Sequence, residues 1–315
     1  MTDQLVTGSV TVHEVGPEHA ADVVAVIHAG FGAREVLDPP STATDETAVS
    51  VAASLARHGG LLAVSGSGPV GALLFADHAD LIGLRRVAVH PEAQGMGVAG
   101  ALVGAAERVA HERGYDGLRL AARAELPGTV RFWEHLGYGE VARVGTAITM
   151  AKALPVEKVA ETAEQARALG EKLAGVLRAG DLVILTGDLG AGKTTFTQGV
   201  GAGLKVRGDI TSPTFVISRV HPSLVGGPAL VHVDAYRLGG VAELDDLDLD
   251  TSLDDAVTVV EWGEGVAETL AETRLEVTLT RAQGDDGGDG SDVRRLRFAP
   301  VGARWIGSGL RDALA

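Results

Sequence analysis

The sequence predicts an α/β protein built from two units, each a β-sheet covered by helices. The length of 315 residues favours two domains, because a single hydrophobic core rarely grows to that size. Short apolar runs alternate with segments of helical spacing throughout the chain. Two glycine-rich stretches, PEAQGMGVAG and GDLGAGKTT, each follow an apolar run and precede a helical segment. We place the boundary between residues 152 and 153, which gives domains 1–152 and 153–315.

The sequence of the N-terminal half predicts a mixed sheet with helices. The expected order of elements is strand, two helices, three strands, helix, strand, helix and strand. Residue alternation and the turn SGSGP define strands, and Gly114 and Gly137 are natural helix ends. The predicted strands are Ser9–Val15, GGLLAV, VGALLFADHA, Leu81–His90, GLRLAAR and EVARVGTAITMAK. The predicted helices are Pro17–Phe31, Thr47–Arg57, Gln94–Arg113 and TVRFWEHLG.

The C-terminal half begins after a predicted linker, Lys152–Thr162, which contains Pro155. A helix is predicted over Glu164–Arg178, and DLVILTGDLGAGKTTFTQGV predicts a strand, a loop and a helix. The acidic segment Ala282–Asp292 is predicted to be the solvated tip of a hairpin. The remaining predicted strands are TFVISRV, ALVHVDAYRL, AVTVVEWGE, LEVTLTR and VRRLRFA.

Composition excludes several classes of function. The formal net charge is −15 and each half is acidic, so neither half is expected to hold a nucleic acid by itself. The chain has no cysteine, which excludes disulfides, thiol nucleophiles and zinc–thiolate sites. It has no apolar run long enough for a membrane span, and its N-terminus lacks a signal-peptide pattern. We expect a cytoplasmic protein that does not interact with membranes.

The segment Gly187–Thr195, called the phosphate loop below, matches G-x-x-x-x-G-K-[ST] and lies between a strand and a helix. Its glycines let backbone N–H groups point at phosphate oxygens, and the following helix adds the positive end of its dipole. Lys193 is predicted to neutralise the β- and γ-phosphates, and the Thr194 hydroxyl to bind Mg²⁺. The alternative without phosphate binding is a glycine-rich turn with a solvated lysine.

Two carboxylates and one hydroxyl-rich segment extend this site. Asp234 ends the predicted strand in HVDAYRL, and Glu261 ends the one in AVTVVEWGE. Because parallel strands direct their carboxyl ends into one crevice, both are expected to lie near Thr194 and the metal ion. Taken alone, a carboxylate that closes a strand is usually a turn or cap residue, and only the phosphate loop beside it favours the metal site. TSPTF (Thr211–Phe215) places hydroxyls beside a proline, which can mark a mobile loop near the γ-phosphate, but by itself the pattern favours an ordinary turn.

In this order and spacing, GDLGAGKTTF, SPTF, HVDAYRL and VEWGE resemble the TsaE family, the ATPase subunit of bacterial tRNA threonylcarbamoyladenosine synthesis. The resemblance runs from about Pro155 to the C-terminus and implies a P-loop NTPase-like α/β domain. It implies Mg²⁺ on Thr194 and Glu261. It also implies that ATP is bound by Trp262 and by the phosphate loop, namely Gly187, Asp188, Leu189, Gly190, Ala191, Gly192, Lys193, Thr194 and Thr195.

The same resemblance implies roles and partners. Asp234 and Lys193 would be catalytic, with Asp234 acting directly or by orienting the attacking water. A switch-like loop would consist of Thr211, Ser212, Pro213, Thr214 and Phe215. The partners would be TsaB- and TsaD-like proteins, which transfer threonylcarbamoyl to adenosine 37 of tRNAs that read codons starting with A. The acidic charge agrees with a subunit that contacts tRNA mainly through those partners.

The second glycine-rich stretch contains Q-x-x-G-x-A at Gln94, Gly97 and Ala99, and we call Gln94–Ala99 the second loop. Free N–H groups at a helix start can hold a pyrophosphate. The loop has no lysine, so it is not an ATPase loop. GMGVAG also satisfies G-x-G-x-x-G, but too many elements precede it for a dinucleotide-binding fold. After it, LRLAARAEL offers only Glu125, which is predicted to lie in a loop.

The element order, VAVHPEAQG and FWEHLGY resemble the GNAT family of acetyl-CoA-dependent N-acetyltransferases over about Ser9–Lys152. The resemblance implies that acetyl-CoA is bound by the backbone of Val87, Ala88, Val89, Gln94, Gly95, Met96, Gly97, Val98 and Ala99. Trp133 stands where the family often has a tyrosine acid, and an indole cannot supply that proton. Tyr138 is expected to be structural. The candidates for a general base are Glu134, His90 and His135.

Two alternatives stay open at this point. The C-terminal half can be a P-loop kinase of a small molecule, although no arginine-rich lid follows the phosphate loop. The N-terminal half can be an acyl-CoA sensor without catalysis. Neither the amine that would accept the acetyl group nor the oligomeric state follows from the sequence.

Overall fold

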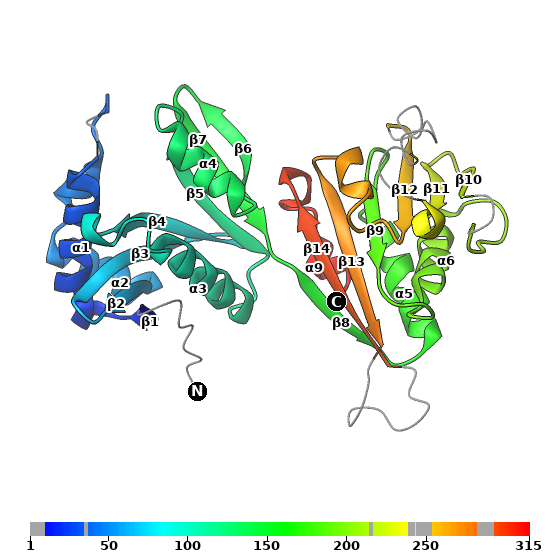
Figure 1. Ribbon diagram of the computed structural model, residues 1–315, viewed down its shortest axis with the longest axis horizontal. Coiled ribbons are helices and arrows are strands. Elements are labelled where there is room, and N and C mark those ends of the chain that lie inside the picture. Colours follow the sequence, from blue (N-terminus) through cyan, green and yellow to red (C-terminus); the bar gives the residue numbers. More distant parts are fainter. Residues whose placement is uncertain (1–9, 35–36, 214–216, 239–242, 244–253, 282–292) are drawn as a thin grey trace. The chain divides into compact units, whose positions relative to one another are not determined.

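The chain divides into two compact units, Met1–Leu154 and Pro155–Ala315. The computed structural model describes residues 10–34, 37–213, 217–238, 243, 254–281 and 293–315. Figure 1 shows that each unit has its own sheet and its own helices, which confirms the predicted α/β fold class. Among the described residues, no helix combines the length and the apolar character that crossing a bilayer requires.

The N-terminal unit contains a seven-stranded sheet in the order β1-β2-β3-β4-β5-β7-β6. Neighbouring strands are antiparallel except β4 and β5, which are parallel. The strands are β1 (Thr11–Val15), β2 (Gly60–Ser65), β3 (Gly68–His78), β4 (Leu81–Val89), β5 (Gly117–Arg123), β6 (Gly139–Val144) and β7 (Ala147–Ala153). The α-helices are α1 (Ala20–Gly32), α2 (Ala48–His58), α3 (Val98–Glu112) and α4 (Pro127–His135).

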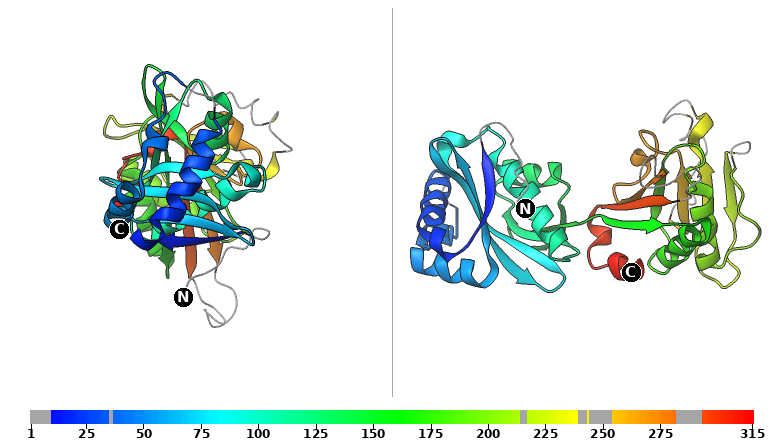
Figure 2. Two further views of the ribbon diagram at one scale, coloured as in Figure 1. Left: turned by 90° about the vertical axis from the view of Figure 1, so that its left-hand side faces the viewer. Right: turned by 90° about the horizontal axis from the view of Figure 1, so that it is seen from below.

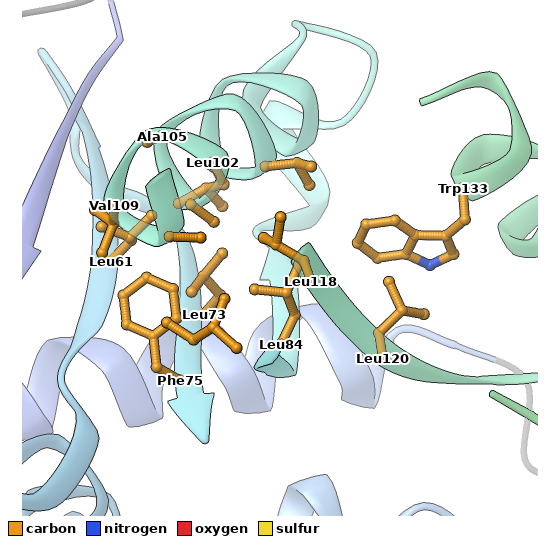
Figure 3. Close-up of a cluster of buried hydrophobic side chains, with 14 of the residues drawn as sticks. Leu61, Leu73, Phe75, Leu84, Leu102, Ala105, Val109, Leu118, Leu120 and Trp133 are labelled. Atoms are coloured by element: carbon orange, nitrogen blue, oxygen red, sulfur yellow. The ribbon is translucent and has the colours of Figure 1, made fainter. Parts of the chain in front are cut away.

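Residue alternation along the central strands separates two hydrophobic cores in this unit. Leu61 on β2 joins the core that contains Leu102 of α3, and Figure 3 shows both side chains there. The next residue, Leu62, joins the core that contains Ile27 of α1. Successive strand residues point to opposite faces of a sheet, so α3 covers one face while α1 and α2 cover the other (Figures 1 and 2).

Two sequence predictions in this unit were wrong in detail. The helix predicted over Gln94–Arg113 begins only at Val98, because Gly95 and Gly97 have φ angles of 78° and 79°, which a right-handed helix does not accept. The closing strand predicted for EVARVGTAITMAK is a hairpin of β6 and β7, with Gly145 at a φ of 60° in the turn between them.

The C-terminal unit contains a second seven-stranded sheet, in the order β10-β11-β12-β9-β13-β14-β8. The strands β11, β12, β9 and β13 are parallel, whereas β10, β14 and β8 pair antiparallel with their neighbours. The strands are β8 (Val156–Ala160), β9 (Leu182–Thr186), β10 (Ser218–His221), β11 (Ala229–Asp234), β12 (Ala256–Glu261), β13 (Arg274–Arg281) and β14 (Arg294–Val301). The α-helices are α5 (Ala163–Ala174), α6 (Lys193–Leu204) and α9 (Leu310–Ala313).

The segment predicted as a linker, Lys152–Thr162, is not an irregular connection. It contains β8, whose Val156 and Ala160 are buried and which pairs with β14. The helix predicted to run to Arg178 ends at Ala174. The predicted hairpin tip Ala282–Asp292 lies outside the described residues.

The parallel strands place the ends of β9, β11 and β12 at one edge of the sheet. In the strand register, Asp234 pairs with Glu261, and Glu261 pairs with Leu185 of β9. The phosphate loop follows β9 directly and leads into α6, which packs against β11 and β12. The predicted phosphate-binding motif and both predicted carboxylates therefore belong to one edge of one sheet.

Candidate functional site

The phosphate loop turns sharply between β9 and α6. Gly187, Gly190 and Gly192 have φ angles of 148°, 80° and 103°, and Gly192 is the residue that precedes the first turn of α6. A Cβ atom at Gly187 would lie 2.3 Å from the carbonyl oxygen of Leu279, so only glycine fits there. At Gly190 a Cβ would meet nothing within 4 Å, so the loop is open on that side. This geometry leaves the N–H groups at the start of α6 available to an anion.

Lys193 lies in the hollow of this loop and is only 5% exposed. Its Nζ donates to the carbonyl oxygens of Gly187, at 2.7 Å, and Asp188, at 3.1 Å. Burial lowers the pKa of Lys193 below the ordinary value for lysine, while the carboxylates of Glu261, Asp234 and Asp188 act in the opposite direction. A buried ammonium that bonds neutral carbonyl oxygens is a strong attractor for phosphate.

Trp262 covers the Lys193 ammonium. The Lys193 Nζ lies 3.6 Å from the centroid of the Trp262 ring, and the Tyr236 ring packs against the same indole with centroids 5.1 Å apart. Trp262 has a φ of 59°, a conformation that a bulky residue rarely adopts. Its backbone N–H donates to the carbonyl oxygen of Leu185 at 2.9 Å, which helps to hold this strained position at the end of β12.

We expect an adenine nucleotide to change the fluorescence of Trp262. Phosphate oxygens attract the Lys193 ammonium more strongly than the indole face does, since a cation–π contact is worth only about 0.5–2 kcal/mol. The two other tryptophans, Trp133 and Trp305, are buried at 5% and 3% exposure, Trp133 in the N-terminal core and Trp305 against Arg304. Titration of the full chain with ADP should therefore alter the emission, and Trp262→Phe should remove the change. A change of equal size in the variant would contradict this assignment.

Glu261 contacts Thr194 of the phosphate loop. The Thr194 hydroxyl donates to Glu261 Oε2 at 3.0 Å, and the other carboxyl oxygen of Glu261 lies 2.8 Å from His232 Nε2. Glu261 is 2% exposed and His232 is fully buried. The structure thus places a hydroxyl and a carboxylate, the two predicted metal ligands, in direct contact.

Asp234 lies at the end of β11, next to Glu261 in the strand register. Its Oδ2 accepts from the Ser212 hydroxyl at 2.8 Å, and its Oδ1 accepts from the backbone N–H of Tyr236 at 3.1 Å. The predicted switch-like loop is thereby connected to Asp234 through Ser212. Thr211 is exposed and Pro213 is buried, whereas Thr214 and Phe215 lie outside the described residues.

Two residues at this site were not predicted from the sequence. Arg294 on β14 donates from Nε to the carbonyl oxygen of Ala191 at 2.9 Å, and this hydrogen bond connects β14 to the phosphate loop. A Cβ at Gly192 would approach this Nε to 2.8 Å. His232 is the second residue, and its signal in the sequence was a lone polar residue in the middle of the apolar strand ALVHVD.

In the N-terminal unit, the second loop lies on the surface before α3. Gln94, Gly95, Met96 and Gly97 are exposed, Val98 is buried, and Ala99 is half-buried. The left-handed conformations of Gly95 and Gly97 bring the chain round to the first turn of α3, and no atom would contact a Cβ at either glycine within 4 Å. The first N–H groups of α3 are therefore accessible to an anion.

The strands β4 and β5 separate next to this loop. They pair only over Leu81–Leu84 of β4, so the later part of β4, which contains Val87, Ala88 and Val89, has no partner on the β5 side. On the other side Ala88 and Val89 pair with β3, and the Val87 carbonyl oxygen accepts from Arg34 at 3.2 Å. The predicted binding residues Val87–Val89 thus border a gap in the sheet hydrogen bonding.

The position of the family's tyrosine acid is part of the hydrophobic core here. Trp133 is 5% exposed and lies beside Leu118 and Leu120 in Figure 3. Its ring packs edge-on against Tyr138, which is 2% exposed, and burial raises the pKa of Tyr138 well above its ordinary value. Of the candidate bases, Glu134 and His135 are exposed on α4, and His90 accepts from the Glu92 N–H at 3.4 Å.

Comparison with known proteins gives a separate result for each unit. A family model described as "Threonylcarbamoyl adenosine biosynthesis protein TsaE" matches residues 160–288. A tRNA threonylcarbamoyladenosine biosynthesis protein TsaE from Streptomyces coelicolor is 61% identical over 140 residues, which cover 44% of this chain and 93% of that protein. The crystal structure of YdiB from Bacillus subtilis is 31% identical, with a TM-score of 0.40, and covers 51% of this chain and 93% of its own.

The model of the acetyltransferase (GNAT) family matches residues 34–138. A structural neighbour of the N-terminal unit is the PaiA N-acetyltransferase from Thermoplasma acidophilum, solved in complex with coenzyme A. It is 16% identical, with a TM-score of 0.42, and covers 46% of this chain and 99% of its own. The two family models thus match different parts of the chain, residues 34–138 and 160–288.

Proposed function

Through its C-terminal unit this chain belongs to the TsaE family of threonylcarbamoyl adenosine biosynthesis proteins, and we propose that residues 153–315 bind and hydrolyse ATP in the modification of adenosine 37 of tRNA. The observation that carries this proposal is the phosphate loop, with the buried ammonium of Lys193 at its centre and Thr194 in contact with Glu261. A solvated surface lysine would not be held in this way. The cytoplasm is the compartment that a role in tRNA modification requires.

The residues present fit a magnesium ion. Mg²⁺ is usually held by one or two protein oxygens, with substrate phosphates and water supplying the rest. Thr194 Oγ1 and Glu261 Oε2 are two such oxygens, 3.0 Å apart, next to the phosphate loop. A bound Mg²⁺ would neutralise charge on the phosphates. Lys193 and the N–H groups of the loop would orient the phosphates and stabilise the charge that develops during transfer.

Asp234 is the residue that we assign to the attacking water. It lies beside Glu261, and it is oriented by Ser212 and by the N–H of Tyr236. A carboxylate that is held in place can orient a water molecule and accept its proton. Ser212 links this carboxylate to the Thr211–Phe215 segment, so a movement of that segment would change the position of Asp234.

Partner proteins resembling TsaB and TsaD would carry the transfer of the threonylcarbamoyl group itself, and would hold most of the tRNA. The acidic character of this chain supports that division, because phosphate backbones require clustered basic residues. Turnover of ATP that depends on those partners would also separate this function from the alternative of a small-molecule kinase.

For residues 1–152 we propose acetyl-CoA binding by the second loop and transfer of the acetyl group to an amine. The exposed start of α3 and the unpaired part of β4 support a site for the pyrophosphate and the pantetheine arm. Trp133 cannot act as the acid, and Tyr138 is buried, so thiolate protonation must come from another group or from water. The alternative is an acyl-CoA sensor, which would bind acetyl-CoA without transferring its acetyl group to an amine.

The test of the ATPase proposal is the threonylcarbamoyladenosine content of tRNA in cells whose only copy of the chain carries Glu261→Gln. This change keeps the size of the side chain but removes the charge beside Thr194 and Lys193. We expect the modified nucleoside to fall at least tenfold, with the protein present at its normal level. Wild-type content of the nucleoside, together with lost ATP turnover by the purified variant, would refute the proposal and favour the kinase.

A further inference from the structure

His232 is a fully buried polar residue at the centre of the ATPase site, and the proposed reaction assigns it no role. It lies on β11, where the register pairs it with Val259 of β12, two residues before Glu261. Residues two apart on a strand share a face, so the Glu261 side chain lies on the same face of the sheet as His232. Its Oε1 lies 2.8 Å from the Nε2 atom of His232.

The contact fixes which atom of the imidazole donates. An ionised carboxyl group only accepts hydrogen bonds, so Nε2 carries the proton in this pair. The other ring nitrogen, Nδ1, is buried with no hydrogen-bond partner among the described residues. Among the described residues, Glu261 is therefore the hydrogen-bond partner of the imidazole, and the ring connects Glu261 to no second polar group.

This hydrogen bond gives the two carboxyl oxygens of Glu261 different partners. Oε1 faces His232 and Oε2 accepts from the Thr194 hydroxyl at 3.0 Å. Without the imidazole, the 2% exposed carboxyl group would keep one buried oxygen unsatisfied and would be free to rotate about its last bond. A Leu or Val would fill the same space in an otherwise apolar strand, so packing alone does not explain a histidine at this position.

We propose that His232 is a positioning residue, which holds the Glu261 carboxylate in the orientation that presents Oε2 beside Thr194 to the divalent metal of the nucleotide. The inference rests on the proposed ATPase function and deepens it. His232 touches neither nucleotide nor metal, and acts only through Glu261. Hydrogen-bonded partners of this kind typically change metal affinity by about 10- to 100-fold when they are removed.

The test measures Mn²⁺ binding to the complex of the full chain with ADP by electron paramagnetic resonance, which needs no turnover. We expect His232→Leu to weaken Mn²⁺ binding by about 10- to 100-fold. His232→Gln keeps an N–H donor near the position of Nε2 and should stay within about threefold of wild type. The affinity for ADP without metal should be unchanged in both variants, because Lys193 and the loop backbone are untouched.

His221 provides a matched control. It lies on the neighbouring strand β10, is 3% exposed, and bonds the Arg207 carbonyl oxygen through Nδ1 at 3.2 Å rather than Glu261. His221→Leu should therefore leave Mn²⁺ binding unchanged although it also removes a buried imidazole. Equal weakening in His221→Leu and His232→Leu would overturn the inference, since both effects would then come from packing.

A double variant separates this inference from the function on which it rests. Once Glu261→Gln has weakened Mn²⁺ binding, adding His232→Leu should weaken it little further, because both changes remove one unit. Fully additive losses would overturn the positioning role, as would wild-type Mn²⁺ affinity in His232→Leu. A wild-type chain that binds ADP but shows no Mn²⁺ binding in the complex would instead refute the proposed metal site, and this inference with it.

Discussion

Lys193→Ala is expected to lower the affinity of the purified chain for ATP by about 100-fold. Charge-assisted hydrogen bonds contribute about 1.5–3 kcal/mol each, so the loss of one or two of them gives roughly 3 kcal/mol. The apo protein should remain folded. The Lys193 Nζ bonds carbonyl oxygens of its own loop and contacts the Trp262 ring, so its removal leaves the strand and helix hydrogen bonds of the unit intact. Calorimetric titration with ATP gives the affinity directly.

Thermal unfolding supplies a second measurement of the same prediction. A ligand at about 100 times its dissociation constant stabilises the native state by about 2.7 kcal/mol, and this gain should fall to about 0.4 kcal/mol in Lys193→Ala at the same ATP concentration. Lys158→Ala is the control, because Lys158 lies on the edge strand β8 of the same sheet and its removal changes the net charge equally. Undiminished ATP affinity in Lys193→Ala would show that the loop does not hold phosphates.

The sequence was sufficient to predict the phosphate loop because each part of that motif is local. A buried strand, glycines at fixed spacing and a helix start follow each other within one stretch of chain, so no long-range contact has to be known. The meeting of Asp234 and Glu261 was predictable for a different reason. Both end apolar strands, and the rule that parallel strands end at one edge brings them together, as their register confirms.

Contacts that depend on side-chain direction or on distant strands could not be predicted in this way. Arg294 reaches Ala191 across more than one hundred residues of sequence, and nothing near it in the chain indicates this partner. Trp262 covers Lys193 from a backbone position with a left-handed conformation, which the propensity of a bulky residue argues against. The strand β8 was not predicted because Pro155 is typical of a linker, although the alternation of VEKVA indicates an edge strand.

Gly97→Asp is expected to weaken the binding of coenzyme A by roughly 30-fold while leaving ATP binding unchanged. Gly97 precedes the first turn of α3 with a φ of 79°, and a Cβ there would meet no atom within 4 Å. Aspartate tolerates this conformation better than most residues, and a negative charge at a helix start favours the helix. The same charge repels a pyrophosphate held by the second loop, by about 2 kcal/mol at a partly exposed site.

Gly97→Asn separates this repulsion from backbone strain. Asparagine has nearly the same shape as aspartate and the same tolerance of left-handed backbone, but it carries no charge. Coenzyme A binding, measured by calorimetry, should therefore fall much less in Gly97→Asn than in Gly97→Asp. The difference between the two variants should also shrink as salt is added, because screening acts on the charge alone. Equal and salt-independent losses would mean that the loop conformation matters and that no pyrophosphate lies at the start of α3.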